Sequence, residues 1–137
     1  MRTKLAIVIA GLLLTALPVW AHHAFNAEFD GTREVKLLGT VTKMEWINPH
    51  AWIHIDVKNT DGSVTKWMVE AAAPNALLRR GWTKEALLPG TVINVQGYQA
   101  KDGANRANGS IITFNDGKKL FVGSSNPNAT EYEKDKK

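Results

Sequence analysis

Cysteine is absent from the 137 residues of this chain. Its absence excludes disulfide bonds, thiol nucleophiles and cysteine-based zinc sites. It also excludes a bacterial lipid anchor, which needs a cysteine directly after an apolar leader. The fold must therefore rely on packing rather than on disulfides.

Long apolar runs are absent too, apart from one near the amino terminus. Arg2 and Lys4 precede an uncharged run from Leu5 to Ala21, which Pro18 interrupts. A membrane-spanning helix needs roughly 20 apolar residues. A basic start, a short apolar stretch and a small residue before the cut are instead typical of a signal peptide. We expect residues 1–21 to be removed and the mature chain to be periplasmic, with no membrane anchor.

A strong excess of one charge is also lacking. The chain has 17 Lys and Arg, 13 Asp and Glu, and a net charge of +4. The leader holds two of the basic residues and no acidic one, so the mature chain has a net charge of about +2. Nucleic-acid binding usually requires a larger basic patch. We therefore exclude nucleic acid and expect a small ligand or a periplasmic protein as the partner.

Motifs for catalysis are missing as well. The chain has no Gly-x-Ser-x-Gly segment and no glycine-rich phosphate loop. Glu45, Asp56 and Glu70 resemble the carboxylates of a glycosidase only in residue type, and we expect them to be solvated beside strands. The sequence therefore predicts a protein that is not an enzyme. A hydrolase or oxidoreductase remains the third alternative, which a copper centre with an open position would favour.

Strand-like alternation of apolar and polar residues dominates the mature chain. Glycine at position 39, inside the first alternating segment, indicates a bend or a bulge. In the third segment, Val64 and Met68 compete with Trp67 and Val69 for the buried face. The expected strands lie at 34–42, 51–57, 64–70, 91–98, 111–114 and 120–122, with turns at 59–62 and 115–117.

Helical signals separate the third and fourth strands. Pro74 suits a first helical position and Gly81 a carboxyl-terminal cap, and a second short helix is expected from Thr83 to Leu88. This order, β-β-β-α-β-β, is that of the OB-fold. We predict an all-β protein with a small OB-like antiparallel β-barrel. Another antiparallel barrel or a sandwich is the alternative.

The sequence also divides the mature chain into three parts. Residues 22–33 are expected to form an extended arm that ends in a turn at Asp30-Gly31. The barrel domain would cover residues 34–123, and residues 124–137 would form a polar, disordered tail. Within the domain, residues 101–108 are predicted to be a polar loop, because glycine and asparagine are frequent there.

Four short segments are distinctive: Gly39-Thr40-Val41, Trp46-Ile47-Asn48-Pro49-His50-Ala51, Pro74-Asn75-Ala76-Leu77-Leu78-Arg79-Arg80-Gly81-Trp82 and Gly97-Tyr98-Gln99-Ala100-Lys101-Asp102-Gly103. Together they resemble a family of small secreted bacterial proteins, catalogued as domain of unknown function 6152. The resemblance extends from His22 to about Ser125. It implies an exported, periplasmic bacterial protein and supplies no catalytic residue.

The four histidines are His22, His23, His50 and His54. Cleavage after Ala21 would place His22 at the amino terminus, where its amine and imidazole could chelate one ion. Alternatively, the amine, the following amide nitrogen and the His23 imidazole could take three positions in a plane. Nitrogen-rich tetragonal sites favour Cu(II). We therefore hypothesise a Cu(II) site at His22 and His23, with His50 as a further ligand. The alternative is a solvated chain start without metal.

His50 and His54 would not share an ion, because they lie roughly 13 Å apart along a strand. Each alone suits a surface or hydrogen-bonded histidine. The strand face that holds Trp52 and His54 is nevertheless a candidate binding surface. OB-folds commonly bind oligonucleotides or oligosaccharides on strands two and three, and aromatic rings can stack on sugars. The candidate ligand-binding residues are Trp46, Asn48, His50, Trp52 and His54.

The tryptophans have a structural alternative, which is that they close the ends of the barrel. Trp82 illustrates it, because it precedes the expected cap at Thr83 and suits a hydrophobic staple with Leu87. Two functions remain open for an exported binding module. One is copper binding, and the other is an adaptor that holds a small polar or saccharide ligand, or a partner protein, on the Trp52/His54 face.

Overall fold

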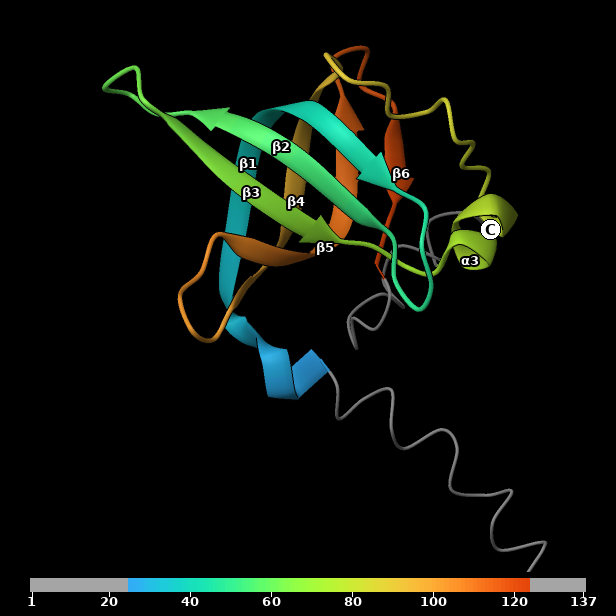
Figure 1. The fold of residues 1–137 in the computed structure, drawn as a ribbon, viewed down its shortest axis with the longest axis horizontal. Helices are drawn as coiled ribbons and strands as arrows, with labels where there is room; N and C mark the ends of the chain where they lie inside the picture. Colours follow the sequence, from blue (N-terminus) through green and yellow to red (C-terminus); the bar gives the residue numbers. More distant parts are fainter. Residues whose placement is uncertain (1–24, 124–137) are drawn as a thin grey trace, which may run out of the picture.

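The computed structural model describes residues 25–123, which form six strands, one short helix after the third strand and a helical turn at 25–28 (Figure 1). The strands are β1 (Phe29–Glu45), β2 (Trp52–Lys58), β3 (Val64–Glu70), β4 (Val92–Ala100), β5 (Arg106–Phe114) and β6 (Lys119–Phe121), and the helix is α3 (Pro74–Arg79). The predicted signal peptide and polar tail lie outside the described residues. Among residues 25–123, no helix is long and apolar enough to cross a membrane.

The strand pairings close five of the strands into a ring. The sheet order is β3-β2-β1-β4-β5-β6, and all of these neighbours are antiparallel. In addition β3 pairs with β5 in parallel, from Met68 opposite Arg106 to Glu70 opposite Asn108. This pairing joins the two ends of the five-stranded part. The predicted all-β, OB-like fold is thus confirmed, with the helix between the third and fourth strands and β6 added beside β5.

The apolar faces of the strands form one core inside this ring. Ile53 and Ile55 of β2 are buried, as the alternation in that strand predicts. In β3 the structure decides between the two faces, because Val69 is buried whereas Val64 and Met68 are exposed. The segment after β3 adds large side chains to the same core, namely Leu77, Trp82 and Leu87.

Strand β1 begins earlier than the sequence predicts. Residues 25–28 are helical and β1 starts at Phe29, where an extended arm was expected to reach residue 33. The pairing of β1 with β4 shifts register between Phe29 and Glu34. Within this irregular stretch Asp30 Oδ1 accepts hydrogen bonds from the Thr32 amide at 3.0 Å and the Thr32 hydroxyl at 2.7 Å. The Asp30-Gly31 turn signal therefore belongs to a distortion inside the strand rather than to a turn before it.

Gly39 allows a close approach between β1 and β2. A Cβ at this position would lie 3.0 Å from Ile55 Cδ1 and 3.1 Å from the Asp56 carbonyl oxygen. The register irregularity itself lies slightly further on, between Val41 and Lys43. The distortion predicted at Gly39 therefore lies two to four residues beyond it, and Gly39 itself permits the close packing of β1 on β2.

Helix α3 has the predicted start and end. Pro74 occupies its first turn, and Gly81 has a φ of 86°. The amides of Gly81 and Trp82 donate to the carbonyls of Leu78 and Leu77, each at 3.1 Å, which is the pattern of a Schellman cap. The second helix predicted from Thr83 to Leu88 is absent. Residues 84–87 form only turns, because a single helical turn before Pro89 does not repay the cost of nucleation.

The loop predicted at 101–108 is shorter than expected. Strand β5 already begins at Arg106, and Asn108 is only 1% exposed. The composition of this stretch is polar and loop-like, but its backbone is taken up by the parallel pairing with β3. A long-range pairing therefore overrides the local signal.

Candidate ligand-binding site

A pocket of about 380 Å³ lies beside the start of β2 and the end of β3. Three parts of the chain contribute to its wall: the segment 25–29, the loop 46–51 and the adjacent strand ends. The lining residues are Phe25, Glu28, Phe29, Ile47, Asn48, Pro49, His50, Trp52 and Glu70. Apolar and aromatic side chains make most of the wall, and the polar groups are few, which is typical of small-ligand sites.

The loop 46–51 is held in place by its backbone. The Ala51 amide donates to the Ala72 carbonyl at 3.2 Å, and the Ala71 amide donates to the Ala51 carbonyl at 2.8 Å. The peptide bond between Asn48 and Pro49 is cis. These contacts fix His50 directly beside the last residues of β3.

His50 is oriented by a buried carboxylate. Its Nδ1 lies 2.9 Å from Glu70 Oε1, and Asn108 Nδ2 donates to the same oxygen at 3.0 Å. Glu70 is only 5% exposed, so the expectation of a solvated acid at this position is wrong. It is buried because the β3–β5 pairing places Asn108 opposite it. With Nδ1 held at Glu70, Nε2 is the ring nitrogen available to a ligand.

The segment 25–29 is packed against the barrel through aromatic contacts. The ring centroids of Phe25 and Phe29 are 5.9 Å apart, and Tyr98 meets Phe25 edge-on at 5.8 Å. Phe25, Phe29 and Ala100 form a small buried cluster of their own. The amide of Lys101 also donates to the Glu28 carbonyl at 3.0 Å. This second cluster holds one wall of the pocket close to the loop.

Trp52, the first residue of β2, is an aromatic residue in the lining of the pocket. It is paired with Glu45 on one side and Glu70 on the other, so the three side chains emerge on the same face of the sheet. Ile53 points to the opposite face and is fully buried in the core. Trp52 itself is half-buried, which leaves part of its indole ring for contact within the pocket.

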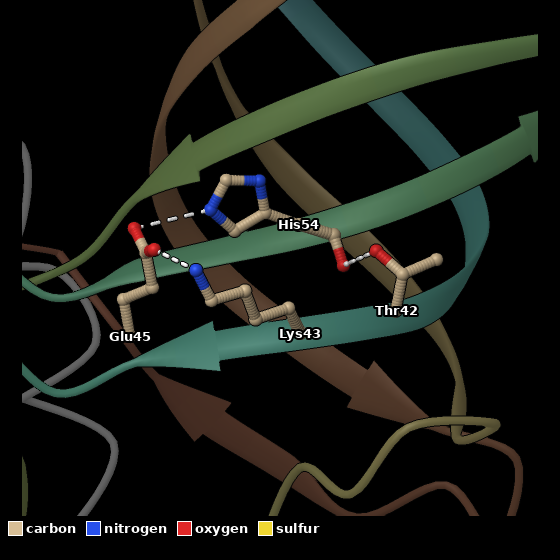
Figure 2. Close-up of polar contacts among 4 residues, drawn as sticks. All are labelled: Thr42, Lys43, Glu45 and His54. Carbon is tan, nitrogen blue, oxygen red and sulfur yellow. Dashed lines mark hydrogen bonds and ion pairs between the residues drawn. The ribbon is translucent and has the colours of Figure 1, made fainter.

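His54 belongs to a different polar cluster on the same strand (Figure 2). Its Nε2 lies 3.2 Å from Glu45 Oε2, and Thr42 Oγ1 donates to its carbonyl oxygen at 3.2 Å. Lys43 Nζ also donates to Glu45. The hydrogen bonds from Lys43 and then His54 lower the pKa of the Glu45 carboxyl below its ordinary value. His54 does not line the pocket.

A family model described as a family of unknown function (DUF6152) matches residues 10–109. The chain belongs to the DUF6152 family. The matched range includes the pocket loop 46–51 and the aromatic segment that packs on the barrel. No curated protein and no solved structure matches the chain.

The pocket of this DUF6152 protein unites three of the five predicted ligand-binding residues, Asn48, His50 and Trp52. The other two lie elsewhere. His54 faces Glu45, and Trp46 packs against the barrel core, with its Nε1 buried and without a hydrogen-bond partner among residues 25–123.

Sequence reasoning missed the walls that flank these three residues. Phe25 and Phe29 are four residues apart, a spacing that could have indicated one turn of helix. Glu70 carried no such signal, because only the pairing with β5 buries it. The residues missed are Phe25, Glu28, Phe29, Ile47, Pro49 and Glu70.

Of the three predicted metal ligands, only His50 lies among the described residues. His22 and His23 lie outside the described residues. Among residues 25–123, no group of three or more His, Asp or Glu side chains is placed to hold a metal ion. His50 and His54 contact different carboxylates, Glu70 and Glu45.

Proposed function

We propose that this DUF6152 protein is an exported binding module that holds a small ligand in the pocket beside Trp52. The observation that carries the proposal is the pocket itself. Its volume of about 380 Å³ falls within the range of roughly 300–1,000 Å³ that is usual for small-molecule sites. Its wall combines aromatic surface with a few fixed polar groups, as such sites do.

The polar wall is organised before any ligand arrives. Glu70 accepts hydrogen bonds from Asn108 and holds His50 Nδ1 at 2.9 Å. A side chain fixed in this way loses little conformational entropy on binding, which favours affinity and orientation. This supports a ligand site rather than an accidental hollow.

The proposed export rests on the leader alone. Arg2, Lys4 and the apolar run up to Ala21 have the composition of a signal peptide. Because the domain has no cysteine, its folding in the periplasm would require no enzyme that forms disulfide bonds. We place the mature protein in the periplasm, with a small ligand or a periplasmic protein as its partner.

Ligand binding should depend on Trp52 and not on the neighbouring His54. We would screen a fragment library by ligand-observed NMR against the processed protein and against two variants, Trp52→Ala and His54→Ala. The proposal expects fragment hits that Trp52→Ala weakens about tenfold or more, through the loss of aromatic contact, and that His54→Ala leaves unchanged. Hits that survive in Trp52→Ala, or none at all, would contradict it.

Copper binding is the second candidate, and the orientation of His50 favours it. Histidines that bind metals usually donate their other ring nitrogen to a carboxylate, as Nδ1 can to Glu70. Phe25 lines the same pocket, and His23 precedes it by two positions in the sequence. The site would combine the amine and imidazoles of His22 and His23 with His50 Nε2.

A titration with Cu(II) separates this candidate from a generic amino-terminal chelate. Intact mass must first show that the exported chain starts at His22. The copper hypothesis then expects His50→Ala to weaken binding about tenfold or more, while His54→Ala, a matched histidine beside another carboxylate, has no effect. Equal affinity in the two variants would leave only the chelate formed by the chain start.

A further inference from the structure

The lining of the pocket is acidic as well as aromatic. Two carboxylates, Glu28 and Glu70, are among the lining residues, and no lysine or arginine is among those that the structure describes there. Glu28 is exposed, whereas Glu70 is buried behind His50. Among the described lining residues the pocket therefore offers a ligand carboxylate groups without an opposing lysine or arginine, and the Glu70 carboxylate faces the imidazole of His50.

Two basic side chains that lie near the segment 25–29, Arg106 and Lys101, are engaged with other groups. Arg106 lies 5.9 Å from the ring centroid of Phe29 and 3.9 Å from Asp102 Oδ2, and Lys101 Nζ donates to the Asn26 carbonyl. Neither contact neutralises Glu28. Neither Arg106 nor Lys101 therefore forms an ion pair with the Glu28 carboxylate.

Two polar groups of the pocket can accept hydrogen bonds from a ligand, beside the Asn48 amide, which can donate as well as accept. A His50 ring that donates from Nδ1 to Glu70 presents a lone pair at Nε2. Glu28 adds carboxylate oxygens, which only accept when ionised. A ligand that satisfies these groups must itself donate hydrogen bonds.

The aromatic side chains of the pocket also favour a ligand that is positively charged. Indole is the best aromatic partner for a cation, and Trp52 lines the pocket together with Phe25. A positive charge near these rings gains from their quadrupoles, and an attached apolar group gains from their surface. Charge, hydrogen bonding and aromatic surface therefore all favour a ligand with a positively charged, hydrogen-bond-donating group attached to an apolar group.

We infer that the pocket binds a small organic ammonium ion, in which a protonated amine is attached to an apolar body. The amine donates hydrogen bonds to Glu28 and to His50 Nε2, and the apolar body packs on Trp52 and Phe25. This inference rests on the proposed function and names the ligand class for the same pocket.

Three probes of nearly equal size test the charge requirement: phenethylamine, 2-phenylethanol and phenylacetate. Each is titrated into the processed protein at pH 7, and the dissociation constant is measured by calorimetry or by NMR shifts. The inference expects phenethylamine to bind about tenfold or more tightly than the alcohol, and phenylacetate to bind most weakly. Equal binding of the amine and the alcohol, or preferred binding of the acid, overturns it.

Two variants locate the charge effect. Glu28→Gln keeps the shape of an exposed side chain and should weaken phenethylamine binding about two- to fivefold, with little change for 2-phenylethanol. Asp56→Asn removes a carboxylate that pairs with Lys66 outside the pocket, and should change neither. An amine affinity that is insensitive to Glu28→Gln overturns the inference.

The outcomes also separate this inference from the proposed function. If the alcohol or the acid binds at Trp52 without preference for the amine, the ligand class is wrong while the pocket remains a binding site. If none of the three probes shifts the resonances of pocket residues, the ammonium inference fails, and the fragment screen decides the proposed function independently.

Discussion

Glu70 is the single residue that links the pocket to the barrel. Its Oε1 lies 2.9 Å from His50 Nδ1 and accepts from Asn108 Nδ2 at 3.0 Å, while the side chain is almost fully buried. Polar groups buried in this way are costly to leave without a partner. The geometry of the pocket wall and the stability of the fold therefore depend on the same carboxylate.

Removing this carboxylate should destabilise the protein. We expect Glu70→Ala to lower the free energy of unfolding by about 2–3 kcal/mol, because the substitution removes the acceptor for two buried or half-buried side chains. Urea unfolding followed by tryptophan fluorescence measures the change. Asp56→Ala, which removes a largely exposed pair with Lys66, should cost less than about 1 kcal/mol. Equal losses in the two variants would show that the Glu70 contacts are not formed.

Glu45 should make stability depend on acid pH. Its pKa is lowered in the folded state by the hydrogen bonds from Lys43 and His54. A lowered folded pKa means that the stabilisation is present above the ordinary glutamate pKa and is lost as the pH falls through the folded value. Wild type should therefore be more stable than Glu45→Gln at neutral pH, and the difference should shrink towards zero under acid conditions. A difference that grows on acidification contradicts this.

Some residues of the site could be predicted from the sequence and others could not. His50 and Trp52 attract attention by residue type and by their place on a strand face. Glu70 does not, because local sequence gives no sign that β5 will pair beside it. Trp46 was a reasonable candidate by type, but its ring is used in the core. Residue chemistry is local information, whereas burial depends on pairing between distant segments.

At the scale of the elements, β4 and β5 come unusually close at Gly97. A Cβ added there would lie 2.3 Å from the Asn108 carbonyl oxygen and 3.1 Å from the Gly109 Cα. Both are backbone atoms, which cannot rotate away as a side chain would. The register of these two strands also shifts between Gln96 and Gly97. Glycine at this position therefore allows the barrel to close on the strand that carries Asn108.

Gly97→Ala should consequently be strongly destabilising. We expect a loss of about 3 kcal/mol, at the upper end of overpacking effects, because the strands would have to separate. Thermal unfolding by circular dichroism gives the value. Gly31→Ala is the matched control, since the nearest atom to its Cβ is Phe25 Cε1 at an ordinary 3.7 Å. Similar losses for both substitutions would contradict the proposed close approach.

The elements were predicted well where signals are local and less well elsewhere. Alternation located β2 and β3, and Pro74 with Gly81 marked α3. The start of β1 was placed too late, because the Asp30-Gly31 signal for a turn lies inside the strand distortion. The stretch before Asn108 was taken for a loop because its composition resembles one. In both cases the strand partner decides the conformation.

At the scale of the whole molecule, residues 25–123 form two apolar clusters. The larger fills the barrel, and the smaller consists of Phe25, Phe29 and Ala100 with Tyr98 packed against it. The smaller cluster attaches the segment 25–29 to the outside of the barrel, where it forms one wall of the pocket. The pocket exists because this segment folds back on a barrel that is otherwise complete.

Phe25→Ala should therefore weaken ligand binding in the pocket while the barrel still folds. The barrel core is untouched, so the strand content by circular dichroism should be unchanged, while the free energy of unfolding falls by about 3 kcal/mol or less. Probe binding at Trp52 should fall with it, because one wall is lost. A variant that binds probes as tightly as wild type would show that segment 25–29 is not part of the site.

The overall architecture was the most predictable feature. Element order alone indicated the OB-like connectivity, and the β3–β5 pairing completes it. The attachment of residues 25–29 was not predicted, since it depends on the contact of Phe25 with Tyr98, more than 70 positions further along the chain.

The measurement that tests the central claim most directly is a map of ligand contacts by two-dimensional NMR on the protein without its predicted signal peptide. Fragments that bind are titrated, and the shifted amide and indole resonances are assigned. Our account predicts that the shifts concentrate on Phe25, His50 and Trp52, the residues that line the pocket. Shifts centred on His54 and Glu45 instead, or spread without a focus over the barrel, would contradict it.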